Sequence, residues 1–144
     1  VKRMYGILEK QFHAYYEEAE RMKGVTGENL LSLIERRLDN VVYRMGIGAS
    51  RKQCRQIVNH GHITVNGKRV DIASYIVKVG DVIAVKESKQ DLDAFKSLKG
   101  MKIVMPKWLE FDTNTLTGKI LALPKREDID SDIKEQLIIE MYSR

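Results

Sequence analysis

Apolar residues recur at steps of three and four along the first 46 residues, the spacing of one face of an α-helix. The first stripe comprises Ile7, Leu8, Phe12, Tyr15, Ala19 and Met22. The second comprises Leu31, Ile34, Leu38, Val41 and Met45. They predict one helix that ends near Gly24 and a second, continuous helix that Thr26 or Gly27 caps and Gly46 ends.

A short polar helix follows. Ser50 and Gln53 form a capping box, which predicts that a helix begins at Arg51, and Gly61 is placed to end it. The apolar residues Cys54, Ile57 and Val58 share its inward face. The outward face then carries Arg51, Lys52, Arg55, Gln56 and Asn59.

The middle of the chain has the alternation and turn signals of β-structure. Asn66-Gly67 lies between two short strand-like segments, 63–65 and 68–70, and is a strong signal for a tight hairpin because both positions favour positive φ. Further strands are predicted around 75–79, 82–85, 108–111 and 119–123, with a short helix over 91–98 and a turn at 116–118.

The last segment is helical again, with Asp130 as N-cap and Ile133, Leu137, Ile138 and Met141 on one side. Helices, then a mostly β region, then a helix indicate an α+β fold. We expect residues 1–35 and 127–144 to form a helical domain from both chain ends. Residues 36–126 should form a second domain, in which helices pack on a small, mostly antiparallel sheet.

Positive charge is concentrated in one part of the chain. Of the formal net charge of +5, residues 36–70 carry +7 from eight basic residues and Asp39, so the rest carries −2. Folded surfaces usually intersperse the two signs, and a block of one sign favours a polyanionic partner. Nucleic acid is the first candidate, with DNA and an acidic protein surface as alternatives to RNA.

Other kinds of site fit the sequence less well. His60 and His62 could supply two ligands to zinc, but a zinc site needs three or four. Cys54, the single cysteine, is expected in the core and not at such a site. His60 is better placed to meet phosphate or the helix dipole. A lone cysteine forms no internal disulfide and fits a reducing cytoplasm, and no apolar run reaches the ~20 residues that span a bilayer.

Arg37-Leu38-Asp39 resembles the motif in which the aspartate of pseudouridine synthases is catalytic. In those enzymes, however, the motif follows any basic helix-and-hairpin module and lies in a large catalytic domain. Here it precedes the module on a predicted helix, so an ion pair or a cap is the expected role of Asp39. An RNA-modifying enzyme fragment that uses the same module stays the alternative function.

The basic segment resembles a known RNA-binding module, the one named after ribosomal protein S-four. The residues that carry this likeness are 50–67, SRKQCRQIVNHGHITVNG. The flanks resemble the bacterial-type S-four family of ribosomal proteins over essentially the whole chain. They are ENLL at 28–31, ERRLDNVVYR at 35–44, PKWL at 106–109 and LIIEMYSR at 137–144.

The resemblance implies a structural protein of the small ribosomal subunit. Such a protein binds 16S rRNA at a helix junction of the 5′ domain, nucleates assembly and lies near the mRNA entrance beside ribosomal protein S-five. Some members also repress their own mRNA. The family carries a basic N-terminal arm, zinc-binding in some members, that this chain lacks, so we expect no contact from it. We expect no catalysis, cofactor, metal, membrane or small-molecule substrate.

The expected RNA-binding residues are the cations and polar groups of the basic block and a second set near the N-terminus. They are Arg36, Arg37, Arg44, Arg51, Lys52, Arg55, Gln56, Asn59, His60, Lys68, Arg69, Lys2, Arg3 and Lys10.

Overall fold

The computed structural model describes residues 5, 7–101, 103 and 105–125 of the chain, apart from the side chain of Ala94. The chain divides into two compact units, residues 1–35 with 124–144 and residues 36–123. The predicted C-terminal helix, and Lys2 and Arg3, lie outside the described residues. The assignment of that helix to the first domain therefore stays a prediction.

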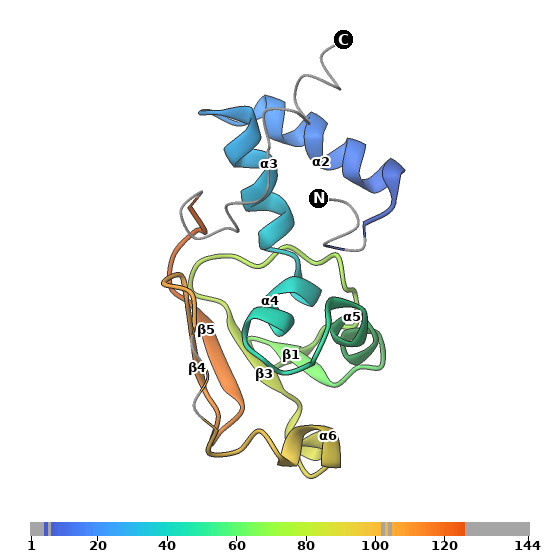
Figure 1. The fold of residues 1–144 in the computed structure, drawn as a ribbon, viewed down its shortest axis with the longest axis vertical. Coiled ribbons are helices and arrows are strands. Elements are labelled where there is room, and N and C mark those ends of the chain that lie inside the picture. Colours follow the sequence, from blue (N-terminus) through green and yellow to red (C-terminus); the bar gives the residue numbers. More distant parts are fainter. Residues whose placement is uncertain (1–4, 6, 102, 104, 126–144) are drawn as a thin grey trace. The chain divides into compact units, whose positions relative to one another are not determined.

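Two helices form the described part of the first unit, α2 (Glu9–Arg21) and α3 (Thr26–Glu35) (Figure 1). The expected end near Gly24 is confirmed, since α2 stops at Arg21 and Gly24 has a φ of 109°. The predicted stripe is wrong at Leu8, which is 79% exposed, whereas Tyr16, outside the predicted stripe, is buried. The small core comprises Tyr5, Ile7, Phe12, Tyr16, Ala19, Leu30, Leu31, Leu33 and Ile34.

The predicted second helix is broken in two. The chain leaves the helical conformation at Arg37, which has a ψ of 141°, and α4 (Leu38–Arg44) begins after it. Arg37 forms a β-bridge with Ile76, and the N–H groups of Leu38 and Asp39 donate to the carbonyls of Tyr75 and Ala73. These long-range hydrogen bonds replace the intrahelical ones that a continuous helix would make. The expected end at Gly46 is confirmed.

The second unit contains α5 (Arg51–Asn59) and an antiparallel sheet of five strands in the order β2-β1-β3-β5-β4 (Figure 1). Ser50 caps α5 as predicted, because its Oγ accepts a hydrogen bond from the Gln53 N–H at 3.1 Å. Asn66 and Gly67 have φ values of 53° and 83°, which confirms the tight hairpin. The strands are β1 (Ile63–Val65), β2 (Lys68–Arg69), β3 (Val82–Val85), β4 (Leu109–Asp112) and β5 (Thr117–Ile120).

Three predictions for the β region need correction. Residues 75–79 form no strand, and only Ile76 makes a bridge. The turn predicted at 116–118 lies at 113–116, because Thr117 and Gly118 already pair with β3 and β4. The helix over 91–98 is reduced to α6 (Asp93–Lys96), which follows a short 3-10 turn, η1 (Glu87–Lys89).

One face of the sheet carries the main core. Alternate strand residues such as Ile63, Val65, Ile83 and Ile120 are buried with Val41 and Val42 of α4 and Cys54 and Val58 of α5. The α+β class is confirmed. This packing fixes α5 by its apolar side and leaves its polar side for solvent. Within the described residues no helix is both long and apolar enough to cross a membrane.

Candidate nucleic-acid interface

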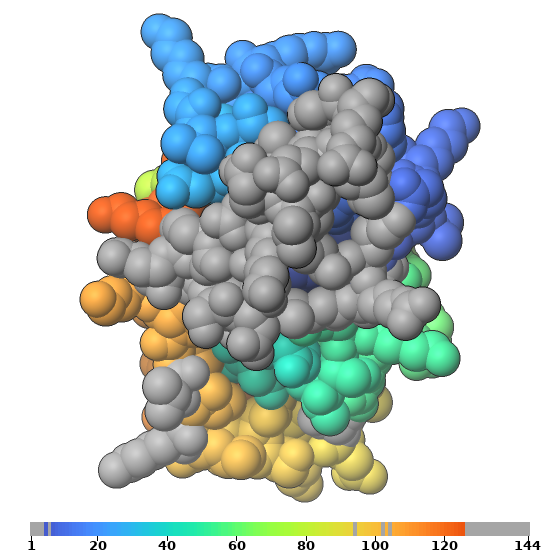
Figure 2. All heavy atoms as spheres, turned by 45° about the horizontal axis from the view of Figure 1, so that its top comes forward, coloured from blue at the N-terminus to red at the C-terminus, as the bar shows by residue number. Residues whose placement is uncertain are grey.

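The outward side of α5 and the β1–β2 hairpin form the candidate interface, called here the basic surface. Green side chains from this part of the chain lie at the surface of the molecule in Figure 2. Its exposed members are Lys52, Gln56, Asn59, His60, Lys68 and Arg69. Four predicted cations are only partly exposed: Arg36, Arg44, Arg51 and Arg55. Lys10 is exposed on α2, in the other unit.

Arg37 is the one predicted binder among the described residues that is buried. Its guanidinium Nε and a terminal nitrogen each lie 3.1 Å from an oxygen of Asp39, which is itself 2% exposed. This bidentate arrangement directs Arg37 into the protein. The ion pair also confirms the expected structural role of Asp39.

Asp39 has a second cationic partner on α5. The Nε of Arg55 lies 3.4 Å from Oδ2 of the same carboxylate, and the Arg55 side chain is 33% exposed. The helical spacing predicts Arg55 on the outward face. In the structure it begins on that face and leans back to α4.

Arg51 is held by neighbouring groups of α4. Its Nε donates to the amide oxygen of Asn40 at 2.9 Å, and its guanidinium carbon lies 4.5 Å from the centre of the Tyr43 ring. Such a cation–π contact adds to the hydrogen bond. The sequence pattern does not predict roles for Asn40 and Tyr43, because neither is charged and both belong to α4, which packs against α5.

Arg69 of the hairpin lies against the end of α5. A β-carbon at Gly61 would overlap the Arg69 guanidinium, so the absence of a side chain there makes room for it. Arg69 also pairs with Asp71 at 3.6 Å, with both side chains more than half exposed. The hairpin and the helix thus present their charges side by side.

The remaining candidate groups are inert or neutral. Cys54 is buried as expected, and burial raises the pKa of its thiol to about 12, so a nucleophilic thiolate is disfavoured at neutral pH. The pKa of His62 is lowered by burial and by the positive charges of Lys89, His60 and Arg69. His62 therefore adds no charge to the surface near neutral pH. No group of three metal-ligating side chains occurs in the part of the chain that the structure describes.

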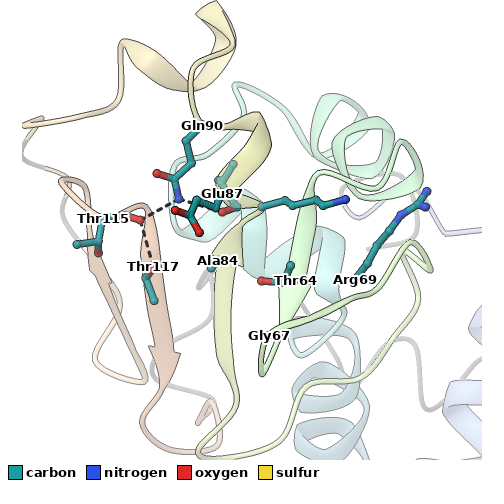
Figure 3. A pocket seen from close by; sticks show the side chains of 10 residues that line it. Thr64, Gly67, Arg69, Ala84, Glu87, Gln90, Thr115 and Thr117 are labelled. Atoms are coloured by element: carbon teal, nitrogen blue, oxygen red, sulfur yellow. Dashed lines mark hydrogen bonds between the residues drawn. The ribbon is translucent and has the colours of Figure 1, made fainter.

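The other face of the sheet has an open hollow of about 590 Å³ (Figure 3). Thr64, Ala84 and Thr117 follow one another across β1, β3 and β5 and form its floor. Gln90 closes one end, where its amide donates to the carbonyl of Thr115 at 3.3 Å. Small side chains and mixed charges line the hollow, and they do not form a catalytic constellation.

Comparison with known proteins supports this description. Residues 1–35 match the model of the ribosomal protein S4/S9 N-terminal domain, and residues 36–83 match that of the S4 domain. The small ribosomal subunit protein uS4 of Ruminiclostridium cellulolyticum is 59% identical over 147 residues, covering all of this chain and 70% of the relative. The chain belongs to the uS4 family of small ribosomal subunit proteins.

Other uS4 proteins show the same degree of likeness. That of Acetivibrio thermocellus is 59% identical and covers 99% of this chain, and that of Clostridioides difficile is 59% identical and covers all of it. The chain spans 70% of the length of each. The two matched family models meet between Glu35 and Arg36, where the chain also divides into its two units.

Proposed function

We propose that this protein is a structural component of the small ribosomal subunit that binds 16S rRNA directly through the basic surface. One observation carries the proposal: cations from α5 and the hairpin lie together on the polar side of elements whose apolar side is fixed in the core. Arg and Lys in such a rigid array suit the phosphate backbone of a folded RNA.

The composition of the surface favours backbone contacts over base stacking. Tyr43 is the only aromatic residue besides the histidines between residues 36 and 70, and its ring faces Arg51. Single-strand binders rely on several aromatic platforms, so a structured RNA is the better partner. Lys10 and, outside the described residues, Lys2 and Arg3 are proposed as further contacts. Arg37 is left out because its guanidinium faces Asp39.

The finer assignment rests on the family resemblance. We place the contact at the helix junction of the 5′ domain, where the protein would nucleate assembly. Its neighbours would be ribosomal protein S-five and other small-subunit proteins near the mRNA entrance, in a cytoplasmic ribosome. Membership of a ribosomal protein family supports a location in the small ribosomal subunit. The names of the relatives specify that subunit and do not specify a neighbouring protein or an rRNA site.

We also propose that the protein is not an enzyme. Asp39, the one candidate catalytic carboxylate, is buried and paired with two arginines, whereas a catalytic group must reach its substrate. An RNA-modifying fragment would convert uridines in labelled rRNA. We expect no conversion, and conversion of uridines by the purified protein would overturn this part of the proposal.

The binding test uses a transcript of the 16S rRNA 5′ domain with excess bulk RNA as competitor. The double variant Lys52→Ala/Lys68→Ala removes two exposed cations of the basic surface. We expect its affinity to fall roughly tenfold or more at 0.1 M salt, because every cation removed from a phosphate forfeits the release of its counterion. Its melting temperature should hardly change, since exposed cations contribute little to folding.

The matched control is Lys96→Ala/Lys99→Ala, which removes the same charge from exposed positions outside the block. It should bind within about twofold of the wild type, because the long-range effect of net charge is screened. Equal losses in the two double variants would mean that total charge and not the basic surface governs binding. The proposal would then be wrong.

A further inference from the structure

Two adjacent polar residues are buried at the start of α4, where that helix meets α5. Asp39 and Asn40 are 2% and 1% exposed. Burying polar groups is unfavourable unless hydrogen bonds satisfy them. Both residues make such bonds to arginines of α5, since Asp39 accepts from Arg55 and Asn40 accepts from Arg51.

The charges of this group do not cancel. Asp39 is a single carboxylate shared by Arg37 and Arg55, so the three side chains together keep one positive charge. Asn40 is neutral, and it therefore orients Arg51 without neutralising it. A carboxylate at both positions would bind the arginines as well but would reduce the attraction for phosphate.

Arg51 is the more completely held of the two. The Asn40 oxygen accepts a hydrogen bond from its Nε at 2.9 Å, and its guanidinium carbon lies over the Tyr43 ring. A free arginine loses much side-chain freedom when it binds a partner. An arginine that is already ordered loses less, which favours binding.

We propose that Asn40 and Asp39 are positioning residues that preorganise Arg51 and Arg55 for RNA phosphates. This inference rests on the proposed function, because it concerns the same surface. Asn40 offers the cleaner test, since Asp39 also pairs with the buried Arg37 and its replacement would disturb the fold.

The experiment is a double-mutant cycle on affinity for the 16S rRNA 5′-domain transcript. It compares the wild type, Asn40→Ala, Arg51→Ala and the double variant, each at a temperature where thermal melts show it folded. If Asn40 acts through Arg51, Asn40→Ala should weaken binding about threefold to tenfold. This is the effect expected from the loss of one hydrogen bond. The double variant should then bind no more weakly than Arg51→Ala alone.

A control cycle pairs Asn40→Ala with Lys52→Ala, which removes an exposed cation of the same helix. Here the losses should multiply, because the buried amide oxygen of Asn40 orients Arg51, whereas Lys52 extends into solvent. A merely structural role of Asn40 would give multiplied losses in both cycles, and that result would overturn the inference.

A second variant covers the case in which Asn40→Ala does not fold. Arg51→Lys keeps the charge but lacks the planar guanidinium that Asn40 and Tyr43 hold. It should bind more weakly than the wild type but more tightly than Arg51→Ala, because the charge is kept and its orientation is lost. Retention of wild-type affinity would contradict positioning. Should Arg51→Ala itself leave binding unchanged, the proposed function of this helix face would fail. If Arg51→Ala weakens binding but the losses multiply in both cycles, only the positioning role of Asn40 would be rejected, and the proposed function would stand.

Discussion

At the scale of single residues, Gly61 determines where the guanidinium of Arg69 can lie. Gly61 ends α5 with a φ of 78°, a conformation that residues with a β-carbon adopt at a cost. A β-carbon there would also overlap the Arg69 guanidinium. The same glycine therefore serves the backbone of the turn and the position of a cation on the basic surface.

Gly61→Ala should separate these two roles when it is compared with Gly80→Ala. Gly80 has a φ of 92°, and a β-carbon there would meet no atom within 4 Å. Each variant should lose about 1–2 kcal/mol in denaturant unfolding from the backbone alone. Only Gly61→Ala should also weaken rRNA binding, by roughly threefold or more, because Arg69 must move. Equal rRNA affinities of the two variants would show that the position of the Arg69 guanidinium does not affect binding.

The sequence predicts the cations of the candidate interface but not their partners. Arg37 and Arg55 have the same charge and lie on predicted helices, yet one is buried and the other reaches solvent. The difference arises from the long-range bridge that turns Arg37 inward, and a local pattern contains no information about it. Asn40 is not predicted because it is uncharged and its partner Arg51 belongs to a neighbouring helix.

At the scale of elements, α5 is the best predicted part of the molecule. Its cap, its end and its inward residues depend on neighbours within four positions, so the sequence alone determines them. The predicted helix from Thr26 to Met45 failed because α4 obtains its first hydrogen bonds from Ala73 and Tyr75, more than thirty residues away. Local rules hold until a distant segment competes for the same backbone groups.

Ile57→Ala should test the inward side of α5. Ile57 is 8% exposed in the main core, so the variant should lose about 2–5 kcal/mol of unfolding free energy through the cavity that it leaves. Its rRNA affinity should stay within about twofold at a temperature where the protein remains folded. Urea unfolding and filter binding on the same sample measure the two quantities.

Ile57→Val is the milder control and should lose about 0.5–1.5 kcal/mol. Should Ile57→Ala instead spare stability and abolish binding, the assignment of the two faces of α5 would be reversed.

At the scale of the whole molecule, charge is segregated and not merely abundant. Residues 36–70 carry +7 while the rest carries −2. A protein of this kind should approach RNA with its basic surface foremost, and it should bind with a strong dependence on salt. The α+β class and the antiparallel sheet could be predicted from the periodicity of apolar residues. The concentration of positive charge on one part of the molecule is predicted by the positions of the charged residues alone.

If about five of these cations meet phosphates, log K should fall against log salt with a slope of about −3.5 to −4.5. Filter binding between 50 and 300 mM potassium chloride would give the slope. The double variant Lys52→Ala/Lys68→Ala should reduce its magnitude by about 1.4–1.8, while Lys96→Ala/Lys99→Ala should leave it unchanged. A nearly flat titration of the wild type would assign binding to contacts other than phosphates.

The buried thiol of Cys54 gives the protein an internal reporter of helix opening. The sequence has one cysteine, on the core side of the helix whose other side is proposed to bind RNA, and the pKa of its thiol is raised to about 12. A thiol reagent can modify it only during the brief intervals in which α5 separates from the sheet. The rate of modification therefore measures how often α5 detaches, and bound RNA should slow it without touching the sulfur.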